Sequence, residues 1–477
     1  MGQNEDLTRR DVMKLAGVTG VTAAAVTTAA KVGGPAIIKA RADSNQVKYG
    51  MIGTGSRGTY LLGHLAKVDN GHCSAVCDLN QQAMDKAAGV IGTNPKKYHD
   101  YRELLSDKDV DAVLIAVPLY EHFPVTRDSL QAGKHTFCEK SLVFRPEEVH
   151  ALRALEAQHP KQVLQVGLQR RYSKYFQATK EMVDKNVLGD VTHIHAQWHR
   201  NPGGSLWVMR PGGKSNPKNW RLYREFSGGL TAELASHHLD VADWMFGAHP
   251  EFVMGLGGLD TWKDGRDVFD NIQLIYQYPG GRKLTYSAIS TNAHCPYLCS
   301  ERPEFGLCIM GTAGAVEINV GDGQKTMPTA LWYREPKSTK VSSGTEQTKT
   351  EAGATFALAG PQKGLPILMP DYEVDKNKDS FVTREMKYAR LWLYQKGVMI
   401  PEEDVNPVET ELWSFFNDSM SGGHPKADVE VGLADSTAVI LSNLAMDQNR
   451  RVYFNEMENL GKDKIDDAMK EDAKHTA

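Results

Sequence analysis

The sequence is poor in cysteine, has no excess of positive charge and carries one apolar run, close to its N-terminus. Six cysteines in 477 residues are too few to staple a fold of this length, which excludes a disulfide-rich scaffold. A net charge of -4 provides no basic field, so nucleic-acid and anionic-membrane ligands are not expected. With 41% apolar and 24% charged residues, the chain has the composition of a globular protein, and its length indicates two domains.

The N-terminal 42 residues differ in composition from the rest. Arg9 and Arg10 precede a weakly apolar run at residues 15–30, and Ala-Arg-Ala occupies residues 40–42. A basic start, an apolar middle and a small-residue end are typical of a secretory signal, and the paired arginines favour the twin-arginine route. We therefore expect residues 1–42 to direct export to the periplasm through the twin-arginine translocase, with an amphipathic anchor as the alternative. No later segment is expected to be long and apolar enough to cross a membrane.

A glycine-rich turn follows the first predicted strand, at residues 47–52. Gly53, Gly55 and Gly58 form a G-x-G-x-x-G pattern before a helical pattern at residues 59–68. Between a strand and a helix, this pattern is the fingerprint of a dinucleotide-binding site. The first glycine permits the tight turn, the second lets the backbone approach a pyrophosphate, and the third lets helix and strand pack closely. The helix N-terminus supplies N–H groups for the phosphates.

The second predicted strand, at residues 73–77, ends in Asp78. A carboxylate at this point accepts hydrogen bonds from ribose hydroxyls and repels a 2′-phosphate, so the sequence favours NAD over NADP as the cofactor. Two alternatives stay open: Asp78 caps the next helix, or Arg57 receives a 2′-phosphate. Ser56 and Arg57 complete the residues of the predicted cofactor loop.

Strands continue to alternate with helices up to residue 169, which predicts a doubly wound parallel sheet of the Rossmann type over residues 43–169. Ligands of such sheets bind at the carboxyl ends of the strands. This rule adds four residues to the predicted cofactor site: Pro118, His122, Glu139 and Lys140.

From residue 170 onward, predicted strands follow one another without intervening helices, at residues 191–199, 271–278, 283–290 and 308–320. This pattern indicates a large, mostly antiparallel sheet, so the fold class is α/β followed by α+β. Residues 170–477 are expected to form the substrate and oligomerisation domain, with an exposed insertion at about 336–365.

One predicted helix, at residues 228–244, interrupts the second domain. Glu233 and His237 lie four residues apart and therefore on one face. A carboxylate beside an imidazole orients the ring and raises its basicity, which suits a general base. The alternative is a structural histidine. His238 lies about 100° further around the helix.

These motifs together resemble the Gfo/Idh/MocA oxidoreductases, the relatives of glucose–fructose oxidoreductase and inositol dehydrogenase. The resemblance rests on the glycine fingerprint, on Glu139-Lys140 and on the G-G-x(3)-[D/E]-x(3)-H-x(2)-D pattern that ends at Asp240. It implies that Lys140 contacts the nicotinamide ribose and the substrate hydroxyl, and that His237 is the catalytic histidine. Physically, the ammonium of Lys140 would stabilise a developing alkoxide.

The resemblance also exposes departures from the family pattern. Glu233 stands where relatives usually have aspartate, Ser141 replaces a proline that is often cis, and Val117 replaces a threonine in the segment that ends at His122. The resemblance further implies that three residues line or support the substrate site: Arg171, Tyr172 and Asp240.

A long loop at residues 200–220 carries Trp207 and Trp220, whose rings suit stacking on a sugar. An ordinary structured loop is the alternative. With His238, these tryptophans complete the predicted substrate-binding residues. Cys295 and Cys299 suggest a disulfide or half a metal site, but no matching His/Cys pair lies nearby, so no metal is expected.

An exported enzyme cannot take up its cofactor from its surroundings, because the periplasm offers no general pool of free NAD. We therefore expect NAD to be tightly bound and recycled in place. The sequence predicts an NAD-dependent oxidoreductase that acts on a hydroxyl of a sugar, glycoside or cyclitol. One alternative is a glycoside hydrolase that works by transient oxidation, elimination and re-reduction; another is a non-catalytic carbohydrate-binding protein. The resemblance also implies a dimer or tetramer formed through the open face of the sheet.

Overall fold

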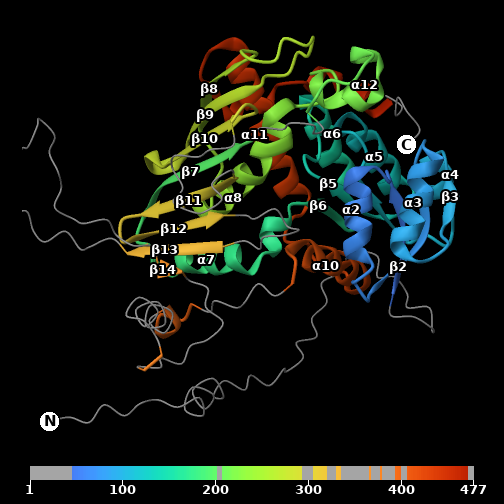
Figure 1. The fold of residues 1–477 in the computed structure, drawn as a ribbon, viewed down its shortest axis with the longest axis horizontal. Helices are drawn as coiled ribbons and strands as arrows, with labels where there is room; N and C mark the ends of the chain where they lie inside the picture. Colours follow the sequence, from blue (N-terminus) through green and yellow to red (C-terminus); the bar gives the residue numbers. More distant parts are fainter. Residues whose placement is uncertain are drawn as a thin grey trace, which may run out of the picture. The chain divides into compact units, whose positions relative to one another are not determined.

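Two β-sheets organise the computed structural model (Figure 1), which describes residues 46–200, 207–292, 305–319, 329–334, 365–366, 377–378, 393–398 and 405–470. Three predictions fall outside these residues: the export signal at 1–42, the pair Cys295 and Cys299, and nearly all of the insertion at 336–365.

Within the described residues, the first sheet has six parallel strands in the order β3-β2-β1-β4-β5-β6. Its strands are β1 (Val47–Ile52), β2 (Gly71–Cys77), β3 (Lys96–Tyr98), β4 (Ala112–Ile115), β5 (His135–Glu139) and β6 (Leu164–Gly167). The connecting helices are α2 (Ser56–Leu65), α3 (Gln81–Ile91), α4 (Tyr101–Ser106), α5 (His122–Gln131) and α6 (Pro146–Glu156), with a short 3-10 turn η1 (Leu119–Glu121). The predicted doubly wound sheet is confirmed, and its strand order reverses between β1 and β4, where such folds bind ligands.

The described part of the second domain contains a nine-stranded sheet in the order β14-β13-β12-β11-β7-β10-β9-β8-β15. Its strands are β7 (Val191–His199), β8 (Phe252–Gly258), β9 (Asn271–Gln277), β10 (Lys283–Ile289), β11 (Phe305–Gly311), β12 (Gly314–Asn319), β13 (Thr329–Arg334), β14 (Leu365–Pro366) and β15 (Val452–Tyr453). Neighbouring strands are antiparallel except β7 and β10, which run parallel, so the sheet is mixed and mostly antiparallel. Leu365, the last residue of the predicted insertion, belongs to β14.

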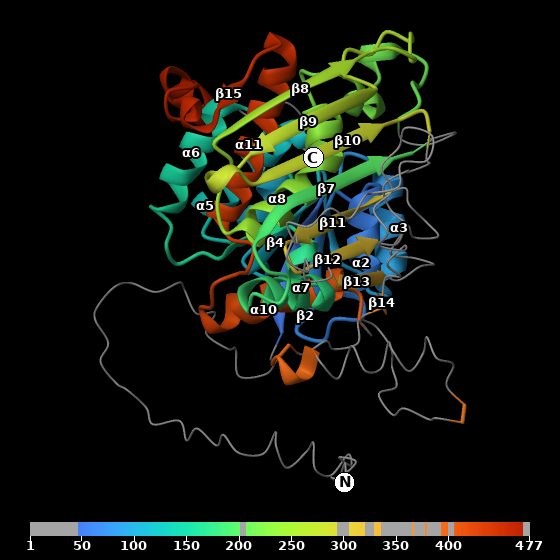
Figure 2. The same ribbon diagram turned by 90° about the vertical axis from the view of Figure 1, so that its left-hand side faces the viewer.

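Helices cover one face of this large sheet. Alternation along β10 explains which face: Leu284, Tyr286 and Ala288 are buried, while Thr285 and Ser287 point to the other side. Figure 2 shows the open face of the sheet in front of the helices behind it. The helices and turns of this half are η2 (Gln169–Tyr172), α7 (Lys174–Asp184), η3 (Gly213–Ser215), η4 (Pro217–Leu222), the π-helical turn η5 (Thr231–Ala235), α8 (Ser236–Phe246), η6 (Pro279–Gly281), α10 (Pro407–Ser421), α11 (Val429–Gln448), η7 (Phe454–Glu458), η8 (Lys462–Lys464) and α12 (Ile465–Lys470).

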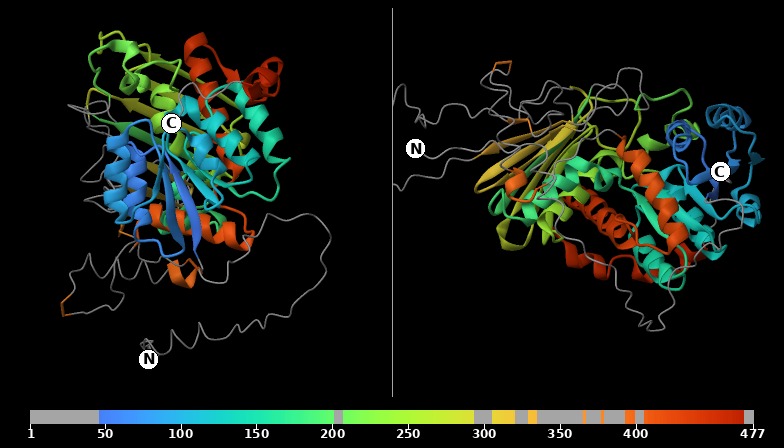
Figure 3. Two further views of the ribbon diagram at one scale, coloured as in Figure 1. Left: turned by 90° about the vertical axis from the view of Figure 1, so that its right-hand side faces the viewer. Right: turned by 90° about the horizontal axis from the view of Figure 1, so that it is seen from below.

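The C-terminal helices return to the first sheet, which the sequence pattern did not predict. Phe415 and Phe416 of α10 are fully buried against Phe137 and Tyr49 of the first sheet, with ring centroids 5.8 and 5.2 Å apart. Figure 3 shows this orange helix beside the blue strands. The first domain is therefore completed by residues from the far end of the chain.

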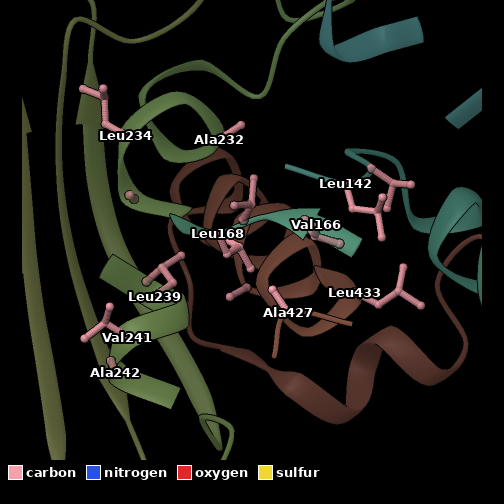
Figure 4. Close-up of a cluster of buried hydrophobic side chains, with 14 of the residues drawn as sticks. Leu142, Val166, Leu168, Ala232, Leu234, Leu239, Val241, Ala242, Ala427 and Leu433 are labelled. Atoms are coloured by element: carbon pink, nitrogen blue, oxygen red, sulfur yellow. The ribbon is translucent and has the colours of Figure 1, made fainter. Parts of the chain in front are cut away.

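The two domains also share one hydrophobic cluster, shown in Figure 4. Leu142 and Val166 of the first domain pack with Ala232 and Leu239 of the site helices and with Leu433 of α11. This common core fixes the carboxyl end of β5 relative to α8.

Among the described residues, α11 is the one helix whose 20-residue length and apolar composition would allow it to span a membrane. Because 67% of its apolar window is buried inside the fold, it serves as a core helix. The expectation that no later segment would be long and apolar enough was wrong, since a largely buried core helix carries apolar residues over most of its surface.

Candidate active site

The glycine turn between β1 and α2 has the backbone geometry that its pattern predicts. Gly53 has a φ of +88°, and a Cβ there would lie 2.7 Å from the Ala116 carbonyl oxygen. A Cβ on Gly58 would lie 1.9 Å from the carbonyl oxygen of Gly53, so these two glycines are required by the chain itself. A Cβ on Gly55 would meet nothing within 4 Å. The open side of Gly55 fits the approach of a dinucleotide pyrophosphate.

Asp78 is held beside this turn at the carboxyl end of β2. Its Oδ2 accepts hydrogen bonds from the backbone N and the hydroxyl of Thr54, at 2.8 and 3.1 Å. The N-cap of α3 is Asn80, whose side chain accepts from Gln82 N and Ala83 N. The alternative that Asp78 caps this helix is therefore wrong, and its position fits ribose recognition.

The guanidinium of Arg57 is engaged by side chains of the first domain, so it is not free to bind a 2′-phosphate. Its Nε donates to Glu139 Oε1 at 2.6 Å, and its Nη2 donates to Gln169 Oε1 at 3.4 Å. Burial lowers the pKa of Arg57, but the Glu139 carboxylate more than compensates and raises it. The guanidinium and Glu139 thus form an ion pair between the glycine turn and β5.

His122 joins the ends of β4 and β5. Its Nδ1 lies 2.7 Å from the Ser141 carbonyl oxygen and its Nε2 lies 3.1 Å from that of Val117. The ring is only 3% exposed, so it positions the two loops rather than presenting a nitrogen to a ligand. The peptide between Lys140 and Ser141 is cis, the geometry that the family resemblance associates with proline. Pro118 begins the η1 turn on the other side of this junction.

Lys140 crosses from the first domain to the helix that carries His237. Its Nζ donates to the carbonyl oxygens of Ala232 and Glu233, at 3.0 and 2.6 Å. Burial lowers the pKa of Lys140, although the carboxylates of Glu233 and Glu139 raise it in part. The ammonium is therefore fixed at the boundary between the domains, next to the first turn of α8.

His237 lies in that first turn and is 7% exposed. Its ring stacks on Trp198 of β7, with centroids 6.1 Å apart, and its buried Nδ1 has no hydrogen-bond partner among the described residues. Burial, followed by the charges of Lys140 and Arg170, lowers the pKa of His237 well below its usual value. The imidazole is therefore neutral near pH 7 and able to accept a proton.

The predicted pairing of Glu233 with His237 is wrong. Glu233 lies in the π-helical turn η5, whose wider winding removes the i, i+4 alignment of a regular α-helix. Its Oε2 accepts a hydrogen bond from Arg221 Nε at 3.1 Å instead. Burial raises the pKa of Glu233, but the charges of Arg221 and Lys140 outweigh it, so the net shift is downward. Glu233 is therefore an ionised partner of cations, and the imidazole basicity does not depend on it.

Several residues predicted to bind substrate instead form contacts within the protein. Arg171 Nε donates to Asp240 Oδ1 at 2.7 Å, and its guanidinium lies over the Trp244 ring at 5.3 Å. Tyr172 is 1% exposed beneath Lys426, and His238 is 1% exposed against Trp198 and Tyr286. These residues support the packing of η2 and α8.

The two tryptophans of the 200–220 loop are covered by arginines. Arg200 lies over the Trp207 ring at 4.6 Å, and Arg221 lies over the Trp220 ring at 4.1 Å. Trp207 is also only 4% exposed, so it offers no open face for a sugar, and its predicted stacking role is wrong. The cation–π contacts instead hold two guanidinium groups near Glu233.

Four residues around His237 were not predicted from the sequence: Trp198, Arg170, Arg200 and Arg221. Arg170 is 3% exposed, and its charge acts on His237 and on Asp240. Trp198 follows the buried Ile194 and Ala196 at intervals of two along β7, and this period was the available signal for it. Within the described ranges, no three His, Cys, Asp or Glu side chains are grouped as a metal site would require.

A parallel sheet with a dinucleotide fingerprint, joined through Lys140 to a second domain with a buried neutral histidine, is the arrangement of a dinucleotide-binding protein of the Rossmann class. Two family models match the chain: "Oxidoreductase family, NAD-binding Rossmann fold" over residues 47–168 and "GFO/IDH/MocA C-terminal domain" over residues 176–317. Together they cover more than half of the chain. The protein belongs to the Gfo/Idh/MocA family.

Among curated relatives, inositol 2-dehydrogenase from Salmonella typhimurium is 33% identical over 152 residues, which cover 32% of this chain and 45% of that protein. The chain thus matches about half the length of this relative. Among solved structures, aldose-aldose oxidoreductase from Caulobacter crescentus has a TM-score of 0.61 at 17% identity, over 86% of this chain and 99% of that one. Scyllo-inositol dehydrogenase from Lactobacillus casei, solved with NAD(H) and scyllo-inositol, has a TM-score of 0.57 at 18% identity, over 86% and 99% of the two chains. These structural likenesses show the fold.

Proposed function

We propose that the protein is an NAD-dependent oxidoreductase acting on a CH–OH group of a sugar, glycoside or cyclitol. The observation that carries this proposal is the meeting of Lys140 and His237. The lysine reaches from the end of β5 to the carbonyls of Ala232 and Glu233, one turn before the neutral histidine. The chain also belongs to a family whose curated members include inositol 2-dehydrogenase.

The cofactor site follows from the geometry of the glycine turn. The open side of Gly55 and the α2 N-terminus would hold the pyrophosphate, and Asp78 would hold the adenosine ribose. Bound NAD supplies the acceptor for a hydride from the substrate carbon. The carboxylate of Asp78 and the engagement of Arg57 by Glu139 support NAD rather than NADP.

The chain's own residues would handle the proton and the charge. The neutral imidazole of His237 takes the proton of the substrate hydroxyl. The ammonium of Lys140, held in place by two carbonyl oxygens, stabilises the developing alkoxide. His122 keeps the loops at the ends of β4 and β5 together, so that Lys140 stays aligned.

The test is an assay with the purified full chain. Bound nucleotide is released and identified by mass, and the protein is then incubated with NAD and a panel of sugars, cyclitols and aryl glycosides. Absorbance at 340 nm and product mass are followed together. Lasting NADH with a keto product supports the dehydrogenase, and Lys140→Ala should abolish it. Aglycone release without net NADH would identify the glycosidase alternative. If neither product forms and Lys140→Ala changes nothing, only the non-catalytic alternative is left.

We further propose that NAD is tightly held and that the protein is exported folded through the twin-arginine translocase. Arg9 and Arg10, ahead of the weakly apolar run, support this address. Cell fractionation of the full chain and of an Arg9→Lys/Arg10→Lys variant tests it, with retention of the variant in the cytoplasm expected. A nucleotide-to-protein ratio near one after dialysis is the result expected for tight binding.

We also propose that two copies of the chain associate through the open face of the large sheet. Met254, Leu256 and Ile275 are 42%, 66% and 45% exposed there, and they line a hollow of about 630 Å³. Contiguous apolar surface of this kind marks interaction sites.

A further inference from the structure

A group of buried polar atoms beside His237 has donors without acceptors. Within the described residues, Arg170 Nη1, Arg200 Nε and Nη2 and the Tyr286 hydroxyl have no hydrogen-bond partner. Arg170 and Tyr286 are 3% and 2% exposed. Buried polar groups in proteins are nearly always satisfied, so this cluster calls for an acceptor that the described part of the chain does not provide.

The pairing of β7 with β10 brings these groups to one side of the sheet. Tyr286 pairs with Ala196, Trp198 follows Ala196 at an interval of two along β7, and Arg200 comes directly after the end of this strand. This face meets α8, where Tyr286 lies 5.4 Å from the His238 ring and Trp198 lies 6.1 Å from the His237 ring. The donors therefore converge next to the predicted catalytic histidine.

Both the backbone and the side chain of Arg200 are held in this position. Its backbone N donates to the Ile289 carbonyl oxygen at 3.0 Å, and its guanidinium lies over the Trp207 ring at 4.6 Å. Burial raises the pKa of Tyr286, and the charges of Arg170 and Arg200 both lower it in part, so both guanidinium groups act on this hydroxyl.

The charges in this region do not balance. Arg221 is paired with Glu233 at 3.1 Å, and Arg171 is paired with Asp240 at 2.7 Å. Among the described residues, Arg170 and Arg200 form no ion pair of their own. The carboxylates whose charges act on them, Asp240 and Glu233, are already paired with Arg171 and Arg221, and the neighbouring histidines are neutral.

Burial lowers the pKa of Arg170 to about 9 and that of Arg200 to about 10, yet both keep their charge at neutral pH. Water would satisfy the hydrogen bonds, but a buried charge also needs a counter-charge.

We propose that the substrate carries a carboxylate, and that Arg170 and Arg200 bind it beside His237. The planar forks of arginine match a carboxylate in geometry and charge, and the Tyr286 hydroxyl adds a further donor. The substrate class would then be acidic sugars of the hexuronate type, with the oxidised hydroxyl near His237. This inference rests on the proposed oxidoreductase function and narrows its substrate.

The test compares hexuronates with the matching neutral hexoses at equal ionic strength. Glucuronate, galacturonate and mannuronate are each tested against glucose, galactose and mannose, and the uronate methyl esters serve as uncharged analogues. Two quantities are measured: the melting temperature of the NAD-loaded full chain, and the KM for NADH formation. At least one uronate should raise the melting temperature, and its KM should lie about 10- to 100-fold below that of the neutral sugar and the ester.

Arg200→Gln should remove this preference, and Arg200→Lys, which keeps the charge but loses the fork, should restore part of it. Arg153→Gln is the matched control, because it removes the same charge from an exposed pair between Arg153 of α6 and Glu430 of α11. It should leave the preference intact. Melting of each variant without ligand confirms that it is folded.

The outcomes separate the two proposals. Equal responses to uronates and neutral sugars, or a uronate effect that survives in Arg200→Gln, would overturn the carboxylate site while leaving the proposed dehydrogenase function intact. Stabilisation by a uronate that disappears in Arg200→Gln, without NADH formation from any sugar, would support the carboxylate site and reject the oxidoreductase function.

Discussion

Among the described residues, no carboxylate pairs with the ring of His237, so burial and the neighbouring cations set the pKa of this imidazole. We expect His237→Asn to lower kcat by about 10²- to 10⁴-fold, the usual contribution of a general base. The content of bound nucleotide should not change, because the cofactor contacts lie in the first domain. The measurement is initial-rate kinetics with nucleotide quantification. His249→Asn is the control, since this histidine on the loop after α8 is 67% exposed in its side chain. A loss shared equally by both variants would contradict the assignment.

The same surroundings predict the pH dependence of the reaction. Burial and the charges of Lys140 and Arg170 hold the pKa of His237 well below the ~6.5 of an ordinary histidine. The active species is the neutral base, so activity is lost only as the pH falls through this lowered pKa. The kcat profile should therefore show no fall near pH 6.5 and an acid limb clearly below it. An acid limb at or above pH 6.5 would indicate a different base.

At the scale of elements, two glycines of the turn after β1 have different roles: Gly58 is needed for folding stability and Gly55 for cofactor binding. Gly58→Ala places a Cβ 1.9 Å from a carbonyl oxygen and should cost about 1–3 kcal/mol of folding free energy, as overpacking does. Gly55→Ala meets nothing within 4 Å and should leave the melting temperature unchanged. It should weaken NAD binding, because its methyl group occupies the side open to the pyrophosphate. Calorimetric unfolding and NAD titration of both variants check this; equal stability losses would contradict it.

The turn and the parallel sheet were predictable because their signals are local. Gly53 and Gly58 are required by contacts within one strand–turn–helix unit, and the buried strands read as short apolar runs. The π-helical turn at Thr231–Ala235 was not predictable, since the same residues fit a regular helical pattern. The partner of Glu233 depended on this winding. The covering of Trp207 by Arg200 also depends on a strand-to-loop contact that sequence spacing does not encode.

At the scale of the whole molecule, the end of the chain unites both halves. α10 covers the first sheet, α11 packs against the site helices, and β15 pairs with β8 at the edge of the second sheet. The position of Lys140 relative to His237 is therefore set by residues more than 150 positions away in sequence. Sequence periodicity reveals such elements but not where they dock, so the two-domain division at residue 170 could not anticipate this shared core.

The open face of the large sheet provides the last prediction. Leu256 is the most exposed of its apolar side chains, at 66%, and would become buried if a second copy packed there. An aspartate at this position would place an unpaired charge in that contact, at a cost of about 3–5 kcal/mol. Leu256→Asp should therefore raise the dissociation constant of the oligomer by ~100-fold or more, measured by light scattering across a dilution series.

Val405→Asp provides the matched control, because Val405 is 41% exposed but lies ahead of α10, outside this sheet. It should leave the oligomer intact. A monomeric wild-type protein, or equal dissociation of both variants, would show that this apolar face does not join two copies of the chain. In that case the exposed side chains of β8 and β9 would need a different partner, since contiguous apolar surface is rarely left open to water.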